Sequence, residues 1–205
     1  MKHTLSLLLS LSLMLAPEAL AQHCHSAPAE ESTASETAQD FEVPDASLLN
    51  QDGHEVSFRD LVGGKVVAMN FVFTTCTTVC PPMGANFGKL QRLLGDRAGQ
   101  DVDLISISID PTVDTPRRLK AWSQKFGTEQ GWTLLTGEKP TVDRLLKDLG
   151  VFVADKQYHS PITLLGNEST GVWQRTNGLT PADELLRQLD ELRRSGEAGS
   201  MEVAP

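Results

Sequence analysis

Apolar and polar positions alternate along the chain in a way that predicts strands followed by helices. Largely apolar runs at residues 66–73 and 102–109 have the length and the β-branched or aromatic content of buried strands. Each run is followed by apolar positions spaced three or four apart, which is typical of an amphipathic helix. A shorter strand at residues 132–135 and a helix at residues 141–149 repeat this order. The order predicts a parallel sheet with right-handed crossovers and with helices on its faces.

The two ends of this predicted domain follow a different pattern. Near its start, short apolar stretches on either side of Asp52-Gly53 predict a β-hairpin. Near its end, residues 162–165 and 171–175 predict an antiparallel hairpin, which a leucine-rich helix follows. The combined pattern predicts an α/β protein with a thioredoxin-like fold over residues 41–194: a central mixed sheet flanked by helices, plus an N-terminal β-hairpin extension.

The segments outside this domain have compositions of their own. A basic start and a short apolar segment precede the small-residue site Ala19-Leu20-Ala21, so residues 1–21 are predicted to be a signal peptide. We therefore expect a periplasmic or secreted protein. The alternative is an uncleaved signal that anchors the chain to the membrane, facing the periplasm. Residues 22–40 are polar and are predicted to be disordered, and residues 195–205 are predicted to form a flexible tail.

Candidate chemistry is concentrated where the first long strand ends. Cys76 and Cys80 lie in the sequence FVFTTCTTVCPP, whose two prolines favour the first turn of a helix and put Cys80 at or just before the helix N-terminus. Unpaired N–H groups and the helix dipole stabilise an anion there, so we expect a lowered thiol pKa. Two thiolates at this spacing could chelate a soft metal ion or close into a disulfide. The alternatives are two buried apolar cysteines and a permanent structural disulfide.

Two other places carry candidate metal ligands. His159 lies in a polar loop just before the last hairpin, and in this fold that loop approaches the cysteine loop. With two thiolates its imidazole would form a trigonal site for Cu(I), or a site for Cu(II) if another ligand joins. The alternative is an ordinary surface histidine. At the predicted start of the mature chain, His23, Cys24 and His25 form either a mobile auxiliary ligand set for copper or zinc, or a solvated tail.

These residues resemble the Sco/SenC family of copper-delivery proteins, which help to assemble the binuclear copper centre of cytochrome c oxidase. FVFTTCTTVCPP is similar to the family's cysteine loop, ISIDPTVDTPRRLKAW is similar to its strand and Asp-Pro helix entry, and His159 lies where the family has its histidine. The resemblance implies copper bound by Cys76, Cys80 and His159, and thiol–disulfide activity of the cysteine pair. Two features depart from it. Tyr158 replaces the family's usual Asp, and Ser160-Pro161 is similar to the cis-proline segment of thioredoxin-like reductases.

Two functions follow from this pattern. The leading hypothesis is an exported metallochaperone that carries a copper ion, Cu(I) or Cu(II), to an apo-site, with the copper subunit of cytochrome c oxidase as the expected recipient. The alternative is a thiol–disulfide oxidoreductase in which Cys76 attacks a partner's disulfide and Cys80 resolves the mixed disulfide. A thiol reductase or another copper chaperone is a further expected partner. The net charge of −9 argues against nucleic acid as a partner, and a membrane is expected only if the signal is uncleaved.

Three weaker interpretations concern neighbouring residues. A peroxiredoxin-like peroxidase would share the fold, but Thr75-Cys76 offers only a fragment of that family's motif. Asp110 and Asp114 either support the metal ligands from behind or are ordinary capping residues. Met69 and Met83 either supply a thioether to Cu(I) or pack in the core.

Overall fold

The computed structural model describes residues 36–38 and 42–201. The first half of the chain forms, in order, β1 (Glu36–Ala38), β2 (Ser47–Asn50), β3 (Glu55–Ser57), α1 (Phe58–Val62), β4 (Val66–Val72), α2 (Cys80–Leu94), η1 (Gly95–Arg97) and β5 (Val102–Ser108). The second half forms α3 (Pro116–Ser123), η2 (Gln124–Phe126), β6 (Trp132–Thr136), α4 (Lys139–Asp148), η3 (Lys156–Tyr158), β7 (Ile162–Asn167), η4 (Glu168–Thr170), β8 (Val172–Asn177) and α5 (Ala182–Met201).

The eight strands of the described residues form one mixed sheet in the order β1-β8-β7-β4-β5-β6-β2-β3. β4, β5 and β6 are parallel neighbours, whereas β7 pairs antiparallel with both β4 and β8. β2 and β3 form a hairpin that joins the sheet through β6. This arrangement confirms the predicted mixed sheet and its N-terminal hairpin extension.

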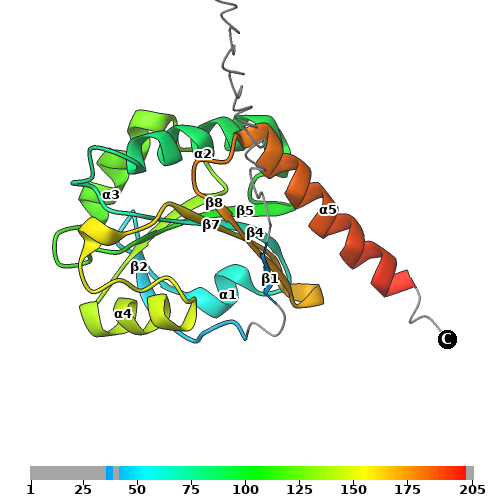
Figure 1. Cartoon of the computed structure of the whole chain (residues 1–205), viewed down its shortest axis with the longest axis horizontal. Coiled ribbons are helices and arrows are strands. Elements are labelled where there is room, and N and C mark those ends of the chain that lie inside the picture. Colours follow the sequence, from blue (N-terminus) through cyan, green and yellow to red (C-terminus); the bar gives the residue numbers. More distant parts are fainter. Residues whose placement is uncertain (1–35, 39–41, 202–205) are drawn as a thin grey trace, which may run out of the picture. The chain divides into compact units, whose positions relative to one another are not determined.

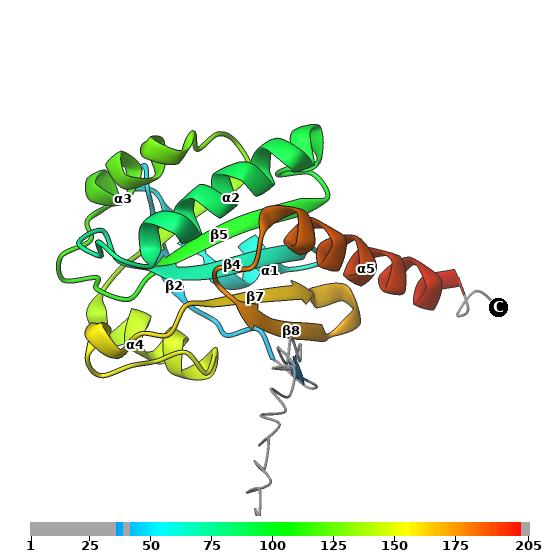
Figure 2. The ribbon, with the colours of Figure 1, turned by 45° about the horizontal axis from the view of Figure 1, so that its top comes forward.

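Helices cover both faces of the sheet (Figure 1). α2, α3 and α5 lie on one face, and α1 and α4 lie on the other. Because β4 is central and covered on both faces, all seven of its residues are buried, which explains its largely apolar sequence. The turned view shows α2 and α5 side by side above the strands (Figure 2).

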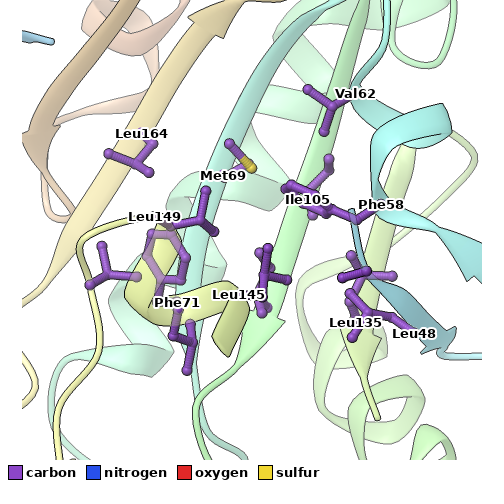
Figure 3. Packing of buried hydrophobic residues seen from close by; sticks show 14 of the residues in the cluster. Leu48, Phe58, Val62, Met69, Phe71, Ile105, Leu135, Leu145, Leu149 and Leu164 are labelled. Atoms are coloured by element: carbon purple, nitrogen blue, oxygen red, sulfur yellow. The ribbon is translucent and has the colours of Figure 1, made fainter. Parts of the chain in front are cut away.

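Each face of the sheet has its own apolar core. The core under α1 and α4 packs strand residues such as Met69 and Ile105 against Phe58 of α1 and Leu145 of α4 (Figure 3). The core under α2, α3 and α5 contains Phe87, Leu119, Trp122, Trp132, Leu185 and Leu189, together with Cys80. Cys80 is therefore part of the packed interior, and its position depends on how α2 lies on the sheet.

β1 and the end of α5 lie outside the predicted bounds of the domain, residues 41–194. The three residues of β1 lie within the segment expected to be disordered, and they pair with β8 at the edge of the sheet. An open sheet edge offers backbone hydrogen bonds, so this pairing needs no hydrophobic pattern in the sequence. α5 continues to Met201, so residues 195–201 of the predicted flexible tail are helical. The apolar stripe ends at Leu192, but no proline interrupts the helix after it.

The predicted signal peptide and the segment His23-Cys24-His25 lie outside the described residues. Among the residues that the structure does describe, no helix is long and apolar enough to cross a membrane.

Candidate dithiol and metal site

The sheet brings three separate loops to one edge. The carboxyl ends of the parallel strands β4 and β5 lead into the cysteine loop, residues 73–79, and into residues 109–115. β7 runs antiparallel to β4, with Thr163 opposite Asn70, so the segment that enters β7 and carries His159 reaches the same edge. The order and direction of the strands therefore place Cys76, Cys80 and His159 at the same edge of the sheet.

The two cysteines lie close together but in different environments. Cys80 is the first residue of α2 and is fully buried, whereas Cys76 is partly exposed in the preceding loop. The backbone N–H of Cys80 donates to the Cys76 sulfur at 3.4 Å, and the Thr78 hydroxyl lies 3.7 Å from that sulfur. Both thiols are free, so the pair is a dithiol at a helix N-terminus.

The environments move the two thiol pKa values in opposite directions. Burial is the largest of the causes that raise the pKa of Cys80 to about 12, and the nearby Cys76 and Asp114 contribute to this rise. Partial burial also opposes ionisation of Cys76, but the hydrogen bonds from Cys80 and Thr78 outweigh it and lower the Cys76 pKa. The expected lowered pKa at the helix start was thus wrong for Cys80, because desolvation outweighs the helix N-terminus there. The hydrogen-bond donors of the helix start act on Cys76 instead.

Asp114 is a fully buried carboxylate behind the cysteine loop. It accepts hydrogen bonds from the backbone N–H of Thr74 at 3.1 Å, from the Thr74 hydroxyl at 2.5 Å and from the Ser108 hydroxyl at 2.7 Å. Burial raises the pKa of Asp114, while the bonds from Thr74 and Ser108 oppose that shift. Its interpretation as a capping residue was wrong, because the neighbouring Thr115 caps α3. Asp114 binds the first residues of the cysteine loop.

Lys156 joins the other two loops at this edge. Its ammonium group pairs with Asp110, which is largely buried, and lies 5.4 Å from the centre of the Phe73 ring. Asp110 directly follows Ile109 after β5, and Phe73 opens the cysteine loop. Sequence reasoning missed Lys156, Thr74 and Ser108. One signal in the sequence could have found Thr74 and Ser108. The carboxyl ends of parallel strands meet at one edge of a sheet, so polar residues at the ends of β4 and β5 are expected to lie close together.

His159 is buried at the same edge, but its imidazole is directed at the backbone. Nε2 lies 2.9 Å from the carbonyl oxygen of Phe71. Because a carbonyl oxygen only accepts, Nε2 carries the hydrogen and donates it, which leaves the lone pair on Nδ1. Burial lowers the pKa of His159, and the bond to Phe71 partly offsets this effect. The lowered pKa favours the neutral imidazole, the form that binds metal ions.

The described residues contain no group of three or more His, Cys, Asp or Glu side chains arranged to hold a metal ion. The structure thus brings Cys76 and Cys80 together and brings His159 to the same edge, without joining the three as ligands. Tyr158, beside the histidine, is 81% exposed. Met69 and Met83 are fully buried.

The proline feature expected near the histidine is absent. None of the peptide bonds in the described residues is cis, so Pro161 does not form the cis-proline of thioredoxin-like reductases. That expectation was wrong, and Pro161 gives no support to the redox alternative. The carbonyl of Pro161 instead accepts a hydrogen bond from the backbone of Gly178 at 3.0 Å.

A family model described as SCO1/SenC matches residues 30–194. The chain belongs to the SCO1/SenC family. A relative in this family, the SCO1 protein homolog of Bacillus subtilis, is 39% identical over 156 residues, which cover 71% of this chain and 80% of the relative. The match includes the cysteine loop, the residues after β5 and His159, so the resemblance seen in the sequence is confirmed.

Solved SCO1/SenC structures have the same fold. One is BsSco, a member of the Sco family of cytochrome c oxidase assembly proteins, in which a disulfide switch is identified. BsSco is 30% identical to this chain, with a TM-score of 0.63, and the alignment covers 77% of this chain and 98% of BsSco. Another is ScoI of Bradyrhizobium japonicum with copper bound, which is 23% identical, with a TM-score of 0.62 over 73% of this chain and 98% of that one. These likenesses confirm the thioredoxin-like arrangement that the sequence predicts.

Proposed function

We propose that this protein is an exported copper chaperone that holds a copper ion on Cys76, Cys80 and His159 and delivers it to an apo-site in another protein. The observation that carries this proposal is the dithiol at the start of α2, where the partly exposed Cys76 sulfur accepts a hydrogen bond from the backbone N–H of the buried Cys80. Membership of the SCO1/SenC family supports it, as does the copper in the ScoI structure of the same fold. Thiolate sulfur and imidazole nitrogen are ligands that suit copper.

The two thiols have different parts in loading. Cys76, with its lowered pKa and partial exposure, is the sulfur that meets an incoming Cu(I) ion first. Cys80 binds next and releases its proton to solvent, because the cation stabilises the buried thiolate that the protein interior alone disfavours. His159 completes the site after its loop moves away from the Phe71 carbonyl. Release then follows by ligand exchange with a thiol of the recipient.

The recipient that we infer is the binuclear copper centre of cytochrome c oxidase. The support is the family relationship to BsSco, a cytochrome c oxidase assembly protein. A thiol reductase or a second copper chaperone is the partner expected to prepare the site. We place this exchange in the periplasm, since residues 1–21 have the pattern of a signal peptide. His23, Cys24 and His25 are proposed only as auxiliary copper ligands.

A second candidate function is thiol–disulfide exchange, and the pKa difference between the two cysteines favours it. The Cys76 thiolate would attack a partner's disulfide, forming a mixed disulfide and releasing one partner thiolate. Cys80, after losing its proton, would then attack the Cys76 sulfur and displace the second partner thiolate. The partner would gain two electrons, and Cys76–Cys80 would become a disulfide. The same dithiol would serve both functions.

An anaerobic Cu(I) titration of the reduced protein against a competing chelator tests the proposal. Cys76→Ser and His159→Ala should each lower the affinity at least about tenfold, because each removes one ligand of three. His54→Ala is the matched control, since His54 is an exposed histidine of the β2–β3 hairpin. A chain without residues 22–35 should keep one tightly bound copper ion. This deletion spares β1, which pairs with β8.

The outcomes separate the two candidate functions. Tight binding that is lost in both ligand variants and retained in the deletion supports the three-ligand chaperone. Weak binding that is equal in His159→Ala and His54→Ala would exclude His159 as a ligand and leave the dithiol as a redox pair.

A further inference from the structure

Asp114 is an unusual residue to find in the interior of this domain. Its side chain is fully buried, and no lysine, arginine or histidine pairs with it among the described residues. A buried carboxylate is costly unless hydrogen bonds replace its hydration. Its oxygens accept from two groups of Thr74 and from the hydroxyl of Ser108. These hydrogen bonds of the carboxylate connect Asp114 with the cysteine loop and with β5.

The contacts of Asp114 lead directly to the dithiol. Thr74 is the second residue before Cys76, and both its N–H and its hydroxyl are bound to the carboxylate. The N–H of Cys76 then donates to the carbonyl of Phe73 at 3.1 Å, and the N–H of Cys80 donates to the Cys76 sulfur. These hydrogen bonds, with the peptide link between Phe73 and Thr74, connect Asp114 with the Cys76 sulfur and with the backbone of Cys80.

On its other side, Asp114 is bonded to a buried strand. Ser108 is the last residue of the buried strand β5, and its hydroxyl also accepts a hydrogen bond from the N–H of Asp110 at 3.0 Å. Arg118 in α3 donates from Nε to the Thr74 hydroxyl oxygen at 3.2 Å, so Thr74 is held from two elements. Asp114 thus ties the first residues of the cysteine loop to β5 and to the start of α3.

We propose that Asp114 is a positioning residue for the dithiol: it fixes Thr74, and through Thr74 it holds the cysteine loop in the shape that places the Cys76 sulfur beside the start of α2, where it can form a disulfide with Cys80. The proposal rests on Cys76 and Cys80 being the working pair of the proposed function, but not on copper. Disulfide formation depends on the effective concentration of one sulfur at the other, which falls when the loop between them is less restricted. Loss of the anchor should therefore make the disulfide less stable relative to the dithiol.

The test uses metal-free protein equilibrated in mixtures of reduced and oxidised glutathione. The reaction converts the protein dithiol and one oxidised glutathione into the Cys76–Cys80 disulfide and two reduced glutathiones. Acid quenching, alkylation and mass spectrometry give the disulfide fraction. Asp114→Asn exchanges one acceptor oxygen for a donor group, and Thr74→Val removes the hydroxyl while keeping the backbone N–H. Both should lower the equilibrium constant for disulfide formation about tenfold, the scale of one buried hydrogen bond to a charged group.

Two further variants sharpen this test. Ser108→Ala removes the third donor but leaves the loop anchored, so it should have a smaller effect than Thr74→Val. Asp103→Asn is the matched control. Asp103 is a partly buried aspartate of β5, the strand that ends at Ser108, and it pairs with Lys65 away from the cysteines. It should leave the equilibrium constant unchanged.

An unchanged constant in Asp114→Asn and Thr74→Val, even with a lower melting temperature, would overturn the proposal and leave Asp114 with a purely structural role. A fall in Asp114→Asn alone would also overturn it, because the carboxylate would then act through its charge. If Asp114→Asn does not fold, Thr74→Val decides. No copper is present, so a failed copper titration would not affect this result, and failure here would leave the metal assignment standing.

Discussion

At the scale of single residues, the two cysteines differ through burial more than through sequence position. Both belong to one short motif, yet Cys80 faces the core under α2 and Cys76 faces the edge of the sheet. A thiolate is stabilised by hydrogen bonds and destabilised by desolvation, so the same helix start gives opposite results at the two positions. The motif therefore contains one reactive thiol and one protected thiol.

This difference predicts selective alkylation of Cys76. In the reduced protein at pH 7, iodoacetamide should modify Cys76 at least about tenfold faster than Cys80, because the thiolate is the reacting form. The Cys76 rate should rise with pH and reach half of its plateau below pH 9.0, the ordinary thiol pKa, whereas Cys80 should respond only as the pH approaches its pKa of about 12. Peptide mapping after timed quenching measures both rates. Equal rates at pH 7 would contradict the assignment of Cys76 as the exposed nucleophile.

The residue scale also marks a limit of sequence reasoning. The prolines correctly predicted that Cys80 begins a helix, because their preference for the first turn is local. Burial of Cys80, and the contact between Asp114 and Thr74 across 40 residues, depend on how the strands are placed in the sheet. Local patterns carry no such information, so Asp114 looked like an ordinary capping residue.

At the scale of elements, a glycine of α2 allows this helix to pack closely against η2. A Cβ atom built on Gly88 would lie 2.3 Å from the backbone carbonyl oxygen of Phe126. Backbone on both sides of this contact leaves little freedom to adjust, so only glycine allows the close approach. The close packing here fixes the helix whose first residue is Cys80.

Gly88→Ala should therefore destabilise the protein although alanine favours helices. Overpacking costs about 1–3 kcal/mol, which should exceed the gain of about 1 kcal/mol in helix propensity. Urea unfolding of the reduced protein should show a lower midpoint with an unchanged slope. Lys89→Ala is the matched control, because Lys89 is an exposed residue of the same helix and its change should alter the midpoint little. A Gly88→Ala midpoint at or above that of the wild type would show that η2 moves aside easily.

Strongly periodic elements were the predictable part of the fold. The sequence pattern predicted β4, β5, α2 and the β2–β3 hairpin, because hydrophobic periodicity and turn residues define them. The pattern missed β1 and the last turns of α5, which have no apolar periodicity to mark them. β1 joins the sheet by backbone pairing with β8, which leaves no comparable signal in the sequence.

At the scale of the whole molecule, the sheet joins segments that are distant in the chain. The cysteine loop follows β4, whereas His159 precedes β7, and the antiparallel pairing of these neighbouring strands brings the two to one edge. A copper ion held by Cys76, Cys80 and His159 would thus link the start of α2 to the entry of β7. Such a link ties together parts of the fold that separate on unfolding.

Copper loading should for this reason stabilise the entire domain. A ligand that binds only the folded state at a free concentration of a hundred times its Kd adds about 2.7 kcal/mol, which corresponds to a rise in Tm of roughly 5–10 °C for a domain of this size. Anaerobic thermal unfolding with buffered Cu(I) should show this rise in the wild type, a smaller one in His159→Ala and none in Cys76→Ser. His54→Ala should match the wild type. The difference between His159→Ala and the wild type is decisive. The two cysteines lie at one loop and would bind copper locally, whereas His159 would connect the ion to the segment that enters β7. An equal rise in His159→Ala and the wild type would mean that copper stays on the dithiol and that the fold does not close around it.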